Sequence, residues 1–387
     1  MSISIGTSTS YVAASQVSGV VENIFLTHAN EARKNGLLDL AEVPNSTTIE
    51  RMLDVAFWTS LRKEEGQSPR ISLAYVSPEQ VEHPLLLSRY LPLEPNALLK
   101  IAPGFERAGI HLGVWKNDED DLYIWGSTST VPHLSFTVDV SEPGLLVIKH
   151  RRSDGLGKFA NVAVLNGDDV KIVSDNSKDM IDCPKILQSM LDLEISAPGK
   201  DSAQLHILLQ LAVSMRIHRR GGTILIIPTN THQWRASISQ PLLHEIVPSY
   251  IGLSKLNVVH GNELNSDDWK RAVAKEIDKI AGLTAIDGAI IMNDSLEVIA
   301  FGEKIIRAGN NPIVESILLT EPTIGFEPKT VHPALHGGTR HLSAAQFTQD
   351  QQDALALVAS QDGKFTTFSW SPSKKIVQAH RMDWLLL

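Results

Sequence analysis

The sequence predicts an α/β protein with two domains: a C-terminal mixed β-sheet flanked by helices, preceded by an N-terminal domain of α+β architecture. Length supports two domains, because 387 residues exceed one ordinary domain and allow each of two to bury a core. After residue 200, helical periods alternate with continuous apolar strands, whereas short strands dominate residues 110–175. The segment 174–200 between them is rich in turn-forming residues. We therefore predict domains at residues 1–180 and 181–387.

The N-terminal domain is predicted to pack a small β-layer on helices. Thr47 and Glu50 have the spacing of a capping box, and apolar residues follow at helical intervals, so a helix is predicted to end near Lys63. Asn166-Gly167 is a strong signal for a hairpin turn. With an acidic turn at 117–121, it predicts two pairs of strands: 112–115 with 122–125, and 162–165 with 170–173.

The C-terminal domain is predicted to alternate helices with apolar strands. The predicted helices cover 202–218, which stops at Gly221-Gly222, and 267–281. The predicted strands cover 223–227, 286–292, 296–301 and 353–359, and a turn at 293–295 makes a hairpin of the second and third. Because these strands are apolar without alternation, we expect the sheet to be covered on both faces.

Composition argues against several classes of partner. The net charge is −9, and basic residues are scattered apart from 149–152 and 218–220, each predicted to be a solvated turn or helix end. This pattern argues against a nucleic-acid-binding surface. No apolar run approaches the roughly 20 residues that span a bilayer, so we expect no membrane partner. The first ten residues lack the basic and apolar regions of a signal peptide, which predicts a cytoplasmic protein. The single Cys183 excludes an internal disulfide.

A carboxylate stands at the predicted start of the strand 286–292. Asp287 lies in an otherwise apolar run, so it must be paired, bound to a ligand or located at the mouth of the strand. The next residue, Gly288, would let a ligand approach the backbone. A simple Asp-Gly turn before the strand is the alternative. The hairpin that follows would place Asp287 and Gly302 at neighbouring strand ends, where the carboxylate could hold a divalent cation.

About fifty residues later, Gly337-Gly338-Thr339-Arg340-His341 precedes a helix-forming run. A helix that begins near Thr339 would direct unpaired amides and its positive dipole outward, which favours phosphate binding. Arg340 can bind phosphate oxygens through two parallel hydrogen bonds, and His341 can donate to phosphate or transfer a proton. Trp234, beside Arg235, is compatible with stacking on a base or with packing in a core.

Asp287-Gly288-Ala289, Gly338-Thr339-Arg340-His341 and the turn Ser360-Gln361-Asp362-Gly363, in this order and spacing, resemble the diadenylate cyclase (DisA_N/DAC) domain family over roughly residues 185–387. The resemblance points to the branch in which an N-terminal regulatory domain precedes the cyclase. It implies an enzyme, a nucleotidyltransferase that condenses two ATP molecules into cyclic di-AMP and releases two pyrophosphates across a face-to-face dimer. A homodimer or higher homo-oligomer is therefore expected. The ligand or protein partner of the N-terminal domain is unknown.

The resemblance also implies the roles of the site residues. Asp287 would bind Mg²⁺ or Mn²⁺ and orient the attacking hydroxyl, while Arg340 and His341 would act on the triphosphate. Asp362 would complete the metal shell. The nucleotide-binding residues would be Gly288, Ala289, Gly302, Gly338, Thr339 and Ser360.

Two positions depart from the family pattern. Arg-His-Arg is usual in the family, whereas this chain has Arg340-His341-Leu342, and Gln361 and Asp362 replace a pair of glutamates. Two alternatives therefore stay open. In place of a diadenylate cyclase, the domain would be a catalytically silent module that senses a nucleotide, or a related nucleotidyltransferase that makes a different cyclic nucleotide.

Overall fold

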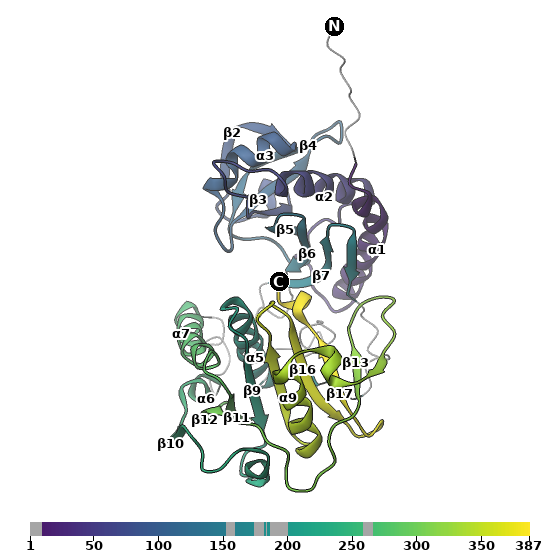
Figure 1. Cartoon of the computed structure of the whole chain (residues 1–387). Coiled ribbons are helices and arrows are strands. Elements are labelled where there is room, and N and C mark those ends of the chain that lie inside the picture. Colours follow the sequence, from purple (N-terminus) through teal and green to yellow (C-terminus); the bar gives the residue numbers. More distant parts are fainter. Residues whose placement is uncertain (1–9, 152–158, 174–181, 183, 186–199, 258–265) are drawn as a thin grey trace. The chain divides into compact units, whose positions relative to one another are not determined.

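The computed structural model describes residues 10–151, 159–173, 182, 184, 185, 200–257 and 266–387. The described residues up to Val173 form one compact unit, and those from Asp182 onward form the other (Figure 1). The boundary predicted near residue 180 and Cys183 both lie outside the described residues. Each unit contains one large mixed sheet with helices, so the predicted α/β class is confirmed.

The N-terminal unit contains an eight-stranded sheet with the order β2-β4-β3-β1-β5-β6-β7-β8, in which β1 and β3 are parallel and the other neighbours antiparallel. Its described helices are α1 (Val12–Lys34), α2 (Ser46–Ser60) and α3 (Pro95–Ile101), with short 3-10 turns at Pro78–Gln80 and Ala102–Gly104. Its strands are β1 (Ser72–Tyr75), β2 (Leu85–Pro92), β3 (His111–Lys116), β4 (Leu122–Thr128), β5 (Phe136–Glu142), β6 (Leu145–Arg151), β7 (Phe159–Asn166) and β8 (Asp169–Ile172).

Helices α1 and α2 contribute to one buried cluster with this sheet. The ring of Phe25 in α1 lies 5.4 Å from that of Phe136 in β5, and Met52 of α2 belongs to the same cluster. The predicted capping box of α2 is wrong. The helix begins two residues earlier than expected, because Asn45 is the N-cap and its side chain accepts a hydrogen bond from the amide of Thr48. Asparagine is among the best N-cap residues, and such a cap contributes about 1 kcal/mol.

The basic residues at 149–151 do not form a solvated turn. Lys149, His150 and Arg151 belong to strand β6, and His150 is buried. The amine of Lys149 lies 2.8 Å from the carboxylate of Asp139 on the adjacent strand, so its charge is paired across the sheet. The predicted solvated turn is therefore wrong, because a hairpin register places these residues within the sheet.

The C-terminal unit contains a nine-stranded sheet with the order β10-β12-β11-β9-β15-β16-β17-β13-β14. Its described helices are α5 (Lys200–Ile217), α6 (Gly252–Asn257), α7 (Asp267–Leu283), α8 (Pro333–His336) and α9 (Thr339–Asp350), with 3-10 turns at Gln233–Ser237 and Asp383–Leu386. Its strands are β9 (Gly222–Ile227), β10 (Glu245–Tyr250), β11 (Ala289–Asn293), β12 (Val298–Glu303), β13 (Ile317–Thr320), β14 (Lys329–Val331), β15 (Leu355–Ala359), β16 (Phe365–Ser371) and β17 (Ile376–Arg381).

Helix α9 covers one face of this sheet, where it lies in front of the central strands in Figure 1. Phe347 of α9 is fully buried in a cluster with Leu225 of β9 and Phe368 of β16. Ile224 and Ile226 of β9 alternate with Leu225 and are buried as well, so the opposite face is also covered, as the apolar strands predicted. Helix α5 contacts β15 and packs against α7.

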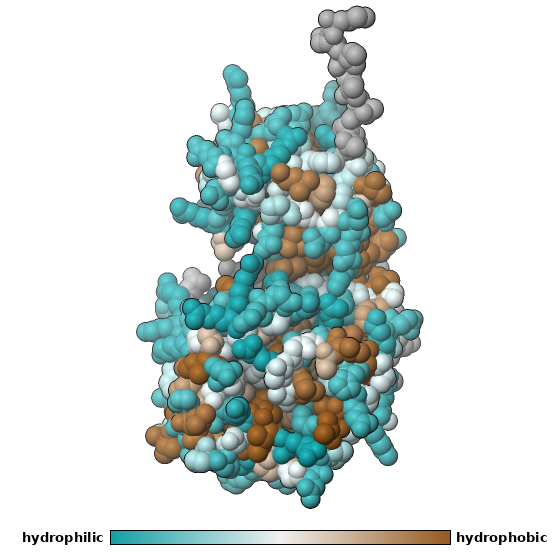
Figure 2. Space-filling view, viewed as in Figure 1, coloured by the Kyte–Doolittle hydropathy of each residue, from teal (hydrophilic) through white to brown (hydrophobic). Residues whose placement is uncertain are grey.

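Among the described residues, every helix is too short or too polar to cross a lipid bilayer. In Figure 2, the visible face mixes hydrophilic with apolar side chains.

We expect the C-terminal unit to lose stability when the pH falls from about 6.5 to about 4. His380 in β17 is fully buried, with Nδ1 2.6 Å from the hydroxyl of Thr320 and Nε2 3.3 Å from that of Ser369, and burial lowers its pKa to about 4. Between these pH values the unfolded chain binds a proton that the folded chain does not. Stability is therefore greatest above pH 6.5, and this group removes roughly 3 kcal/mol by pH 4.

The test is urea unfolding of the wild-type chain and of His380→Gln at several pH values from 7.5 to 4.5. The variant should be less stable than the wild type at pH 7.5, and the difference should shrink as the pH falls. A difference that is constant over the whole range would contradict the assignment.

Candidate active site

Four neighbouring strands of the C-terminal sheet have one terminus at the same edge, where β9 and β11 begin and β12 and β15 end. Ala289 of β11 pairs with Thr223 of β9 on one side and with Glu303 of β12 on the other. On the far side of β9, Gly222 pairs with Ala359 of β15. The N-terminus of α9 lies at this edge too. A cavity of about 930 Å³ opens there, lined by Thr223, Leu243, Asp287, Gly288, Ala289, Gly302, Glu303, Lys304, Ile305, Gly338, Thr339, Arg340, His341, Ser343, Ser360, Gln361 and Asp362. Every site residue predicted from the sequence is in this lining, whereas the roles given to those residues stay predictions.

Two glycines bring the turn before β11 against the end of β12. Gly288 has φ +111° and Gly302 has φ +66°, both in the region that favours glycine. A Cβ added to Gly288 would lie 2.4 Å from the carbonyl carbon of Gly302, so only glycine permits this approach. Strands β11 and β12 pair in antiparallel orientation, so the predicted hairpin is present. The strand itself begins at Ala289 and not at residue 286, since the positive φ of Gly288 interrupts the extended backbone.

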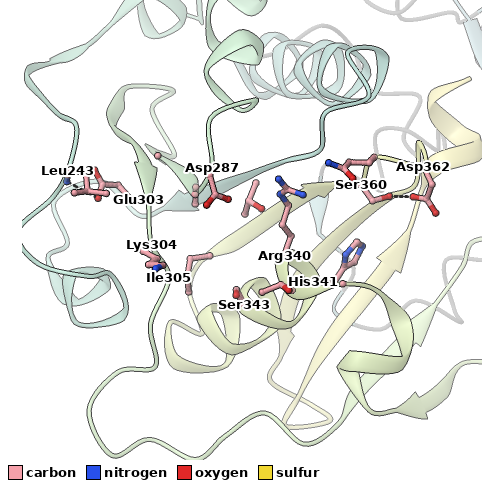
Figure 3. Close-up of a pocket in the computed structure, with 17 residues that line it drawn as sticks. Leu243, Asp287, Glu303, Lys304, Ile305, Arg340, His341, Ser343, Ser360 and Asp362 are labelled. Atoms are coloured by element: carbon pink, nitrogen blue, oxygen red, sulfur yellow. Dashed lines mark hydrogen bonds between the residues drawn. The ribbon is translucent and has the colours of Figure 1, made fainter.

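Asp287 stands just outside this glycine contact. Its side chain is exposed and faces the cavity (Figure 3). Within the described part of the chain, its carboxylate makes no hydrogen bond or ion pair. An acidic group at a strand end with no protein partner is available to a cation or to a hydroxyl donor.

Helix α9 presents its N-terminus to the same cavity. Gly338 is the N-cap and supplies no side-chain cap, so the amides of Thr339 and Arg340 precede the first hydrogen bonds of the helix, which the amides of His341 and Leu342 make to the carbonyl of Gly338. A Cβ added to Gly338 would meet no atom within 4 Å, so the approach to these amides is open. The helix end is therefore suited to an anion.

Arg340 provides a cation next to these amides. Its side chain is half-buried, and one guanidinium nitrogen lies 3.0 Å from the position that a Cβ on Gly221 would take. Gly221, with φ +72°, thus leaves room for the guanidinium at the start of β9. Among the described residues no carboxylate pairs with Arg340. Its charge is consequently available to a ligand in the cavity.

His341 is the most buried of the predicted catalytic residues, with 4% of its surface exposed. Burial is the main cause that lowers its pKa, and the imidazole of His336, whose own pKa falls to about 4 mainly through burial, lies 5.3 Å away. Both rings are therefore neutral at pH 7. A neutral imidazole at the first turn of a helix can still donate one hydrogen bond to an anion.

The turn between β15 and β16 holds Ser360 and Asp362. The carboxylate of Asp362 accepts a hydrogen bond from the hydroxyl of Ser360 and lies 2.7 Å from the amine of Lys364. The hydrogen bonds from Lys364 and then from Ser360 lower the pKa of Asp362 to about 2. In Figure 3, Asp362 and Asp287 lie on opposite sides of Arg340. Both oxygens of Asp362 are thus engaged by neighbours, in contrast to those of Asp287.

The residues present fit a cation that is held partly by phosphate oxygens. No group of three or more His, Cys, Asp or Glu side chains in the described residues could hold a metal ion alone. Mg²⁺ typically binds one or two carboxylates together with substrate phosphates, and not a cage of protein ligands. Asp287 on one side of the cavity and an anion at the N-terminus of α9 would provide such a set.

The sequence did not predict six further residues of the lining, which are Thr223, Leu243, Glu303, Lys304, Ile305 and Ser343. Glu303 carried a usable signal, because it ends an apolar strand in the same way that Asp287 precedes one. Leu243 carried no such signal, because it lies on a loop that is 60 residues from Glu303 in the sequence. Trp234 is buried in the core with Nε1 donating to the carbonyl of Thr231, so it packs in the core and lies outside the lining.

Gly288→Ala is expected to destabilise the C-terminal unit by about 3 kcal/mol, since the new Cβ would collide with the backbone of Gly302 at a positive φ. Gly338→Ala is the matched control, because this glycine lines the same cavity with open space around it and φ −77°. The control should cost less than about 1 kcal/mol. Urea unfolding of both variants provides the comparison, and equal losses would refute the steric argument.

Comparison with known protein families finds a match for one part of the chain. Residues 38–129, which lie in the N-terminal unit, match the family described as "Probable sensor domain DACNV". No curated protein matches the chain. The N-terminal unit is therefore similar to a probable sensor domain over the stretch from the loop before α2 to the end of β4.

Proposed function

We propose that the C-terminal unit is a diadenylate cyclase that condenses two ATP molecules into cyclic di-AMP and two pyrophosphates. One observation carries the proposal. A single cavity unites an exposed carboxylate, Asp287, with the open N-terminus of α9 and the guanidinium of Arg340, which pairs with no carboxylate in the part of the chain that the structure describes. The sensor match supports it independently, because DACNV domains lie N-terminal to diadenylate cyclase domains.

The charges in the cavity suggest how the nucleotide lies. The triphosphate would contact the amides of Thr339 and Arg340 and the guanidinium of Arg340. The neutral ring of His341 would add a hydrogen bond to a phosphate oxygen, and Ser360 would add another by turning its hydroxyl away from Asp362. These donors would stabilise the negative charge that develops on the leaving pyrophosphate.

Asp287 would hold Mg²⁺ or Mn²⁺ together with the phosphate oxygens. When bound, the cation supplies Lewis-acid polarisation of the α-phosphate. Asp287 would also orient the 3′-hydroxyl that attacks this phosphate. In each of two such steps a bond forms between the 3′-oxygen and the α-phosphorus, the bond to the β-phosphate oxygen breaks, and the hydroxyl proton passes to a base or to water.

One cavity supplies half of the reaction. Each 3′-hydroxyl must attack the nucleotide bound by another copy, so the active form would be a homodimer with facing sites or a larger assembly of such pairs. The N-terminal unit would regulate that assembly by binding a ligand or a protein. A shift of population toward the facing arrangement would then raise activity.

A silent nucleotide sensor is the second candidate, and two observations favour it. Leu342 stands where the family usually has an arginine, and its side chain packs against the core cluster of α9 outside the cavity lining. Asp362 is engaged by Ser360 and Lys364, so it is poorly placed to bind metal. A site with these two changes could bind a nucleotide without turning it over.

Asp287→Asn tests the proposed reaction. We expect it to lower the rate of cyclic di-AMP formation at least about 100-fold, because loss of the metal-binding charge removes several kcal/mol of transition-state stabilisation. Binding of ATP without a divalent cation should change little. The measurement is mass spectrometry of products after incubation of the full chain with ATP and Mn²⁺, alongside titration calorimetry.

Asp278→Asn is the matched control, since Asp278 is exposed on α7 and outside the cavity lining. It should leave the rate unchanged. If the wild-type chain binds ATP and forms no product with Mn²⁺ or Mg²⁺, the silent sensor replaces the cyclase. Turnover of another nucleoside triphosphate in place of ATP would indicate a different cyclic nucleotide.

A further inference from the structure

The imidazole of His341 is closely surrounded by groups that the proposed chemistry does not use. A Cβ added to Gly337 would lie 2.4 Å from Cγ of this ring and 2.5 Å from its Nδ1. The ring of His336 lies almost perpendicular to it, with centroids 5.3 Å apart, and the ring of Phe368 meets it edge to face at 6.0 Å. The imidazole therefore occupies space that is free only because residue 337 has no side chain.

Gly337 is required for space and not for backbone conformation. Its φ is −172°, which is extended backbone that any residue adopts. This separates it from Gly288 and Gly302, whose positive φ values favour glycine by themselves. The next residue, Gly338, has no atom within 4 Å of an added Cβ. Of these two consecutive glycines, only Gly337 is constrained by the side chain of His341.

The two rings that contact His341 are held in place by strand β16. Nε2 of His336 lies 3.2 Å from the hydroxyl of Thr366 in this strand. Phe368, also in β16, is fully buried in the core cluster, and its ring lies 6.4 Å from that of His336. A side chain packed between fixed neighbours has few rotamers open to it. The orientation of the His341 ring is therefore set by its surroundings.

The enclosed ring keeps a polar edge for the cavity. His341 is 4% exposed and lines the cavity, and Figure 3 shows its ring between the side chains of Arg340 and Asp362. Among the described residues, no hydrogen bond joins a partner to either ring nitrogen, and neither nitrogen is shut off from solvent. A buried polar group is costly unless it is hydrogen-bonded. The donor of this neutral ring is therefore available to a ligand in the cavity.

We propose that Gly337 and His336 are positioning residues that hold the imidazole of His341 with its N–H directed at an anion bound at the N-terminus of α9. The inference rests on the binding of phosphates in this cavity, which is part of the proposed function. Gly337 leaves the space for the ring, and His336 with Phe368 restricts its rotation. A donor that is already oriented loses little rotamer freedom when the anion binds, so its hydrogen bond adds more to affinity.

The test is calorimetric binding of inorganic tripolyphosphate and of ATP to the full chain, as wild type, Gly337→Ala, His341→Ala and the double variant. In Gly337→Ala the new methyl group would take the place of the imidazole and turn it away from the anion. Binding of both ligands should weaken about tenfold, the effect of losing roughly one hydrogen bond to a charged group. His341→Ala should weaken binding to the same extent, because it removes the same donor.

The double variant separates positioning from other roles. Without the imidazole the new methyl group has nothing to displace, so the double variant should bind no more weakly than His341→Ala alone. Effects that multiply, or a Gly337→Ala variant that binds as the wild type, would overturn the inference. Gly282→Ala is the matched control, because Gly282 is exposed on α7 with open space around it and lies outside the lining. The control should bind as the wild type.

His336→Ala tests the second positioning residue by the same logic. It should weaken tripolyphosphate binding when His341 is present and have no effect in the His341→Ala background. An effect of equal size in both backgrounds, or none in either, would overturn the role of His336. Should Gly337→Ala fail to fold, this pair of measurements decides alone.

The outcome is distinguishable from that of the cyclase proposal. A wild-type chain that binds tripolyphosphate and ATP without forming cyclic di-AMP would refute the cyclase and leave the positioning of His341 to be decided by the variants. A wild-type chain that binds neither ligand would overturn both proposals.

Discussion

The close approach of Gly288 to Gly302 is the constraint on which the candidate site depends. It lets the turn that carries Asp287 meet the strand end that carries Glu303, with less than a side chain between the two backbones. Any other residue at position 288 would separate β11 from β12 at this edge. This contact would then no longer set the turn of Asp287 against the strand end from which Glu303 holds the loop at Leu243 and His244. Two glycines thus determine the geometry of one half of the cavity.

The other half depends on a helix and on space around a cation. Phe347 packs in the core about two helical turns after the start of α9. This packing fixes the direction of the helix and therefore the position of its N-terminus at the cavity. Gly221 leaves the room that the Arg340 guanidinium occupies, and Gly338 leaves the first amides open. Opposite charges therefore face each other across one cavity without neutralising each other. A ligand that brings both a cation and phosphates would satisfy both sides at once.

The charged groups around the cavity differ in how they are engaged, and this difference bears on function. Asp362 forms an ion pair with Lys364, and both oxygens of Glu303 accept hydrogen bonds from backbone amides. The carboxylate of Asp287, in contrast, has no partner among the described residues. Residues of similar type thus divide into those that build the site and those that remain available to a ligand. Burial lowers the pKa of His341, so this ring adds no charge near pH 7 to a lining whose charged side chains are its carboxylates, Arg340 and Lys304.

The sequence by itself determined the local structure that carries the predicted site residues, all of which line one cavity. Apolar runs predicted the strands around Asp287, and the glycine pair predicted the start of α9, because both depend on short-range backbone preferences. It misplaced the cap of α2 and the basic residues of β6, where a neighbouring side chain or a hairpin register decided the outcome. Only the tertiary structure brought Glu303 to Leu243, since a contact across sixty residues depends on strand register and leaves no periodic trace in the sequence.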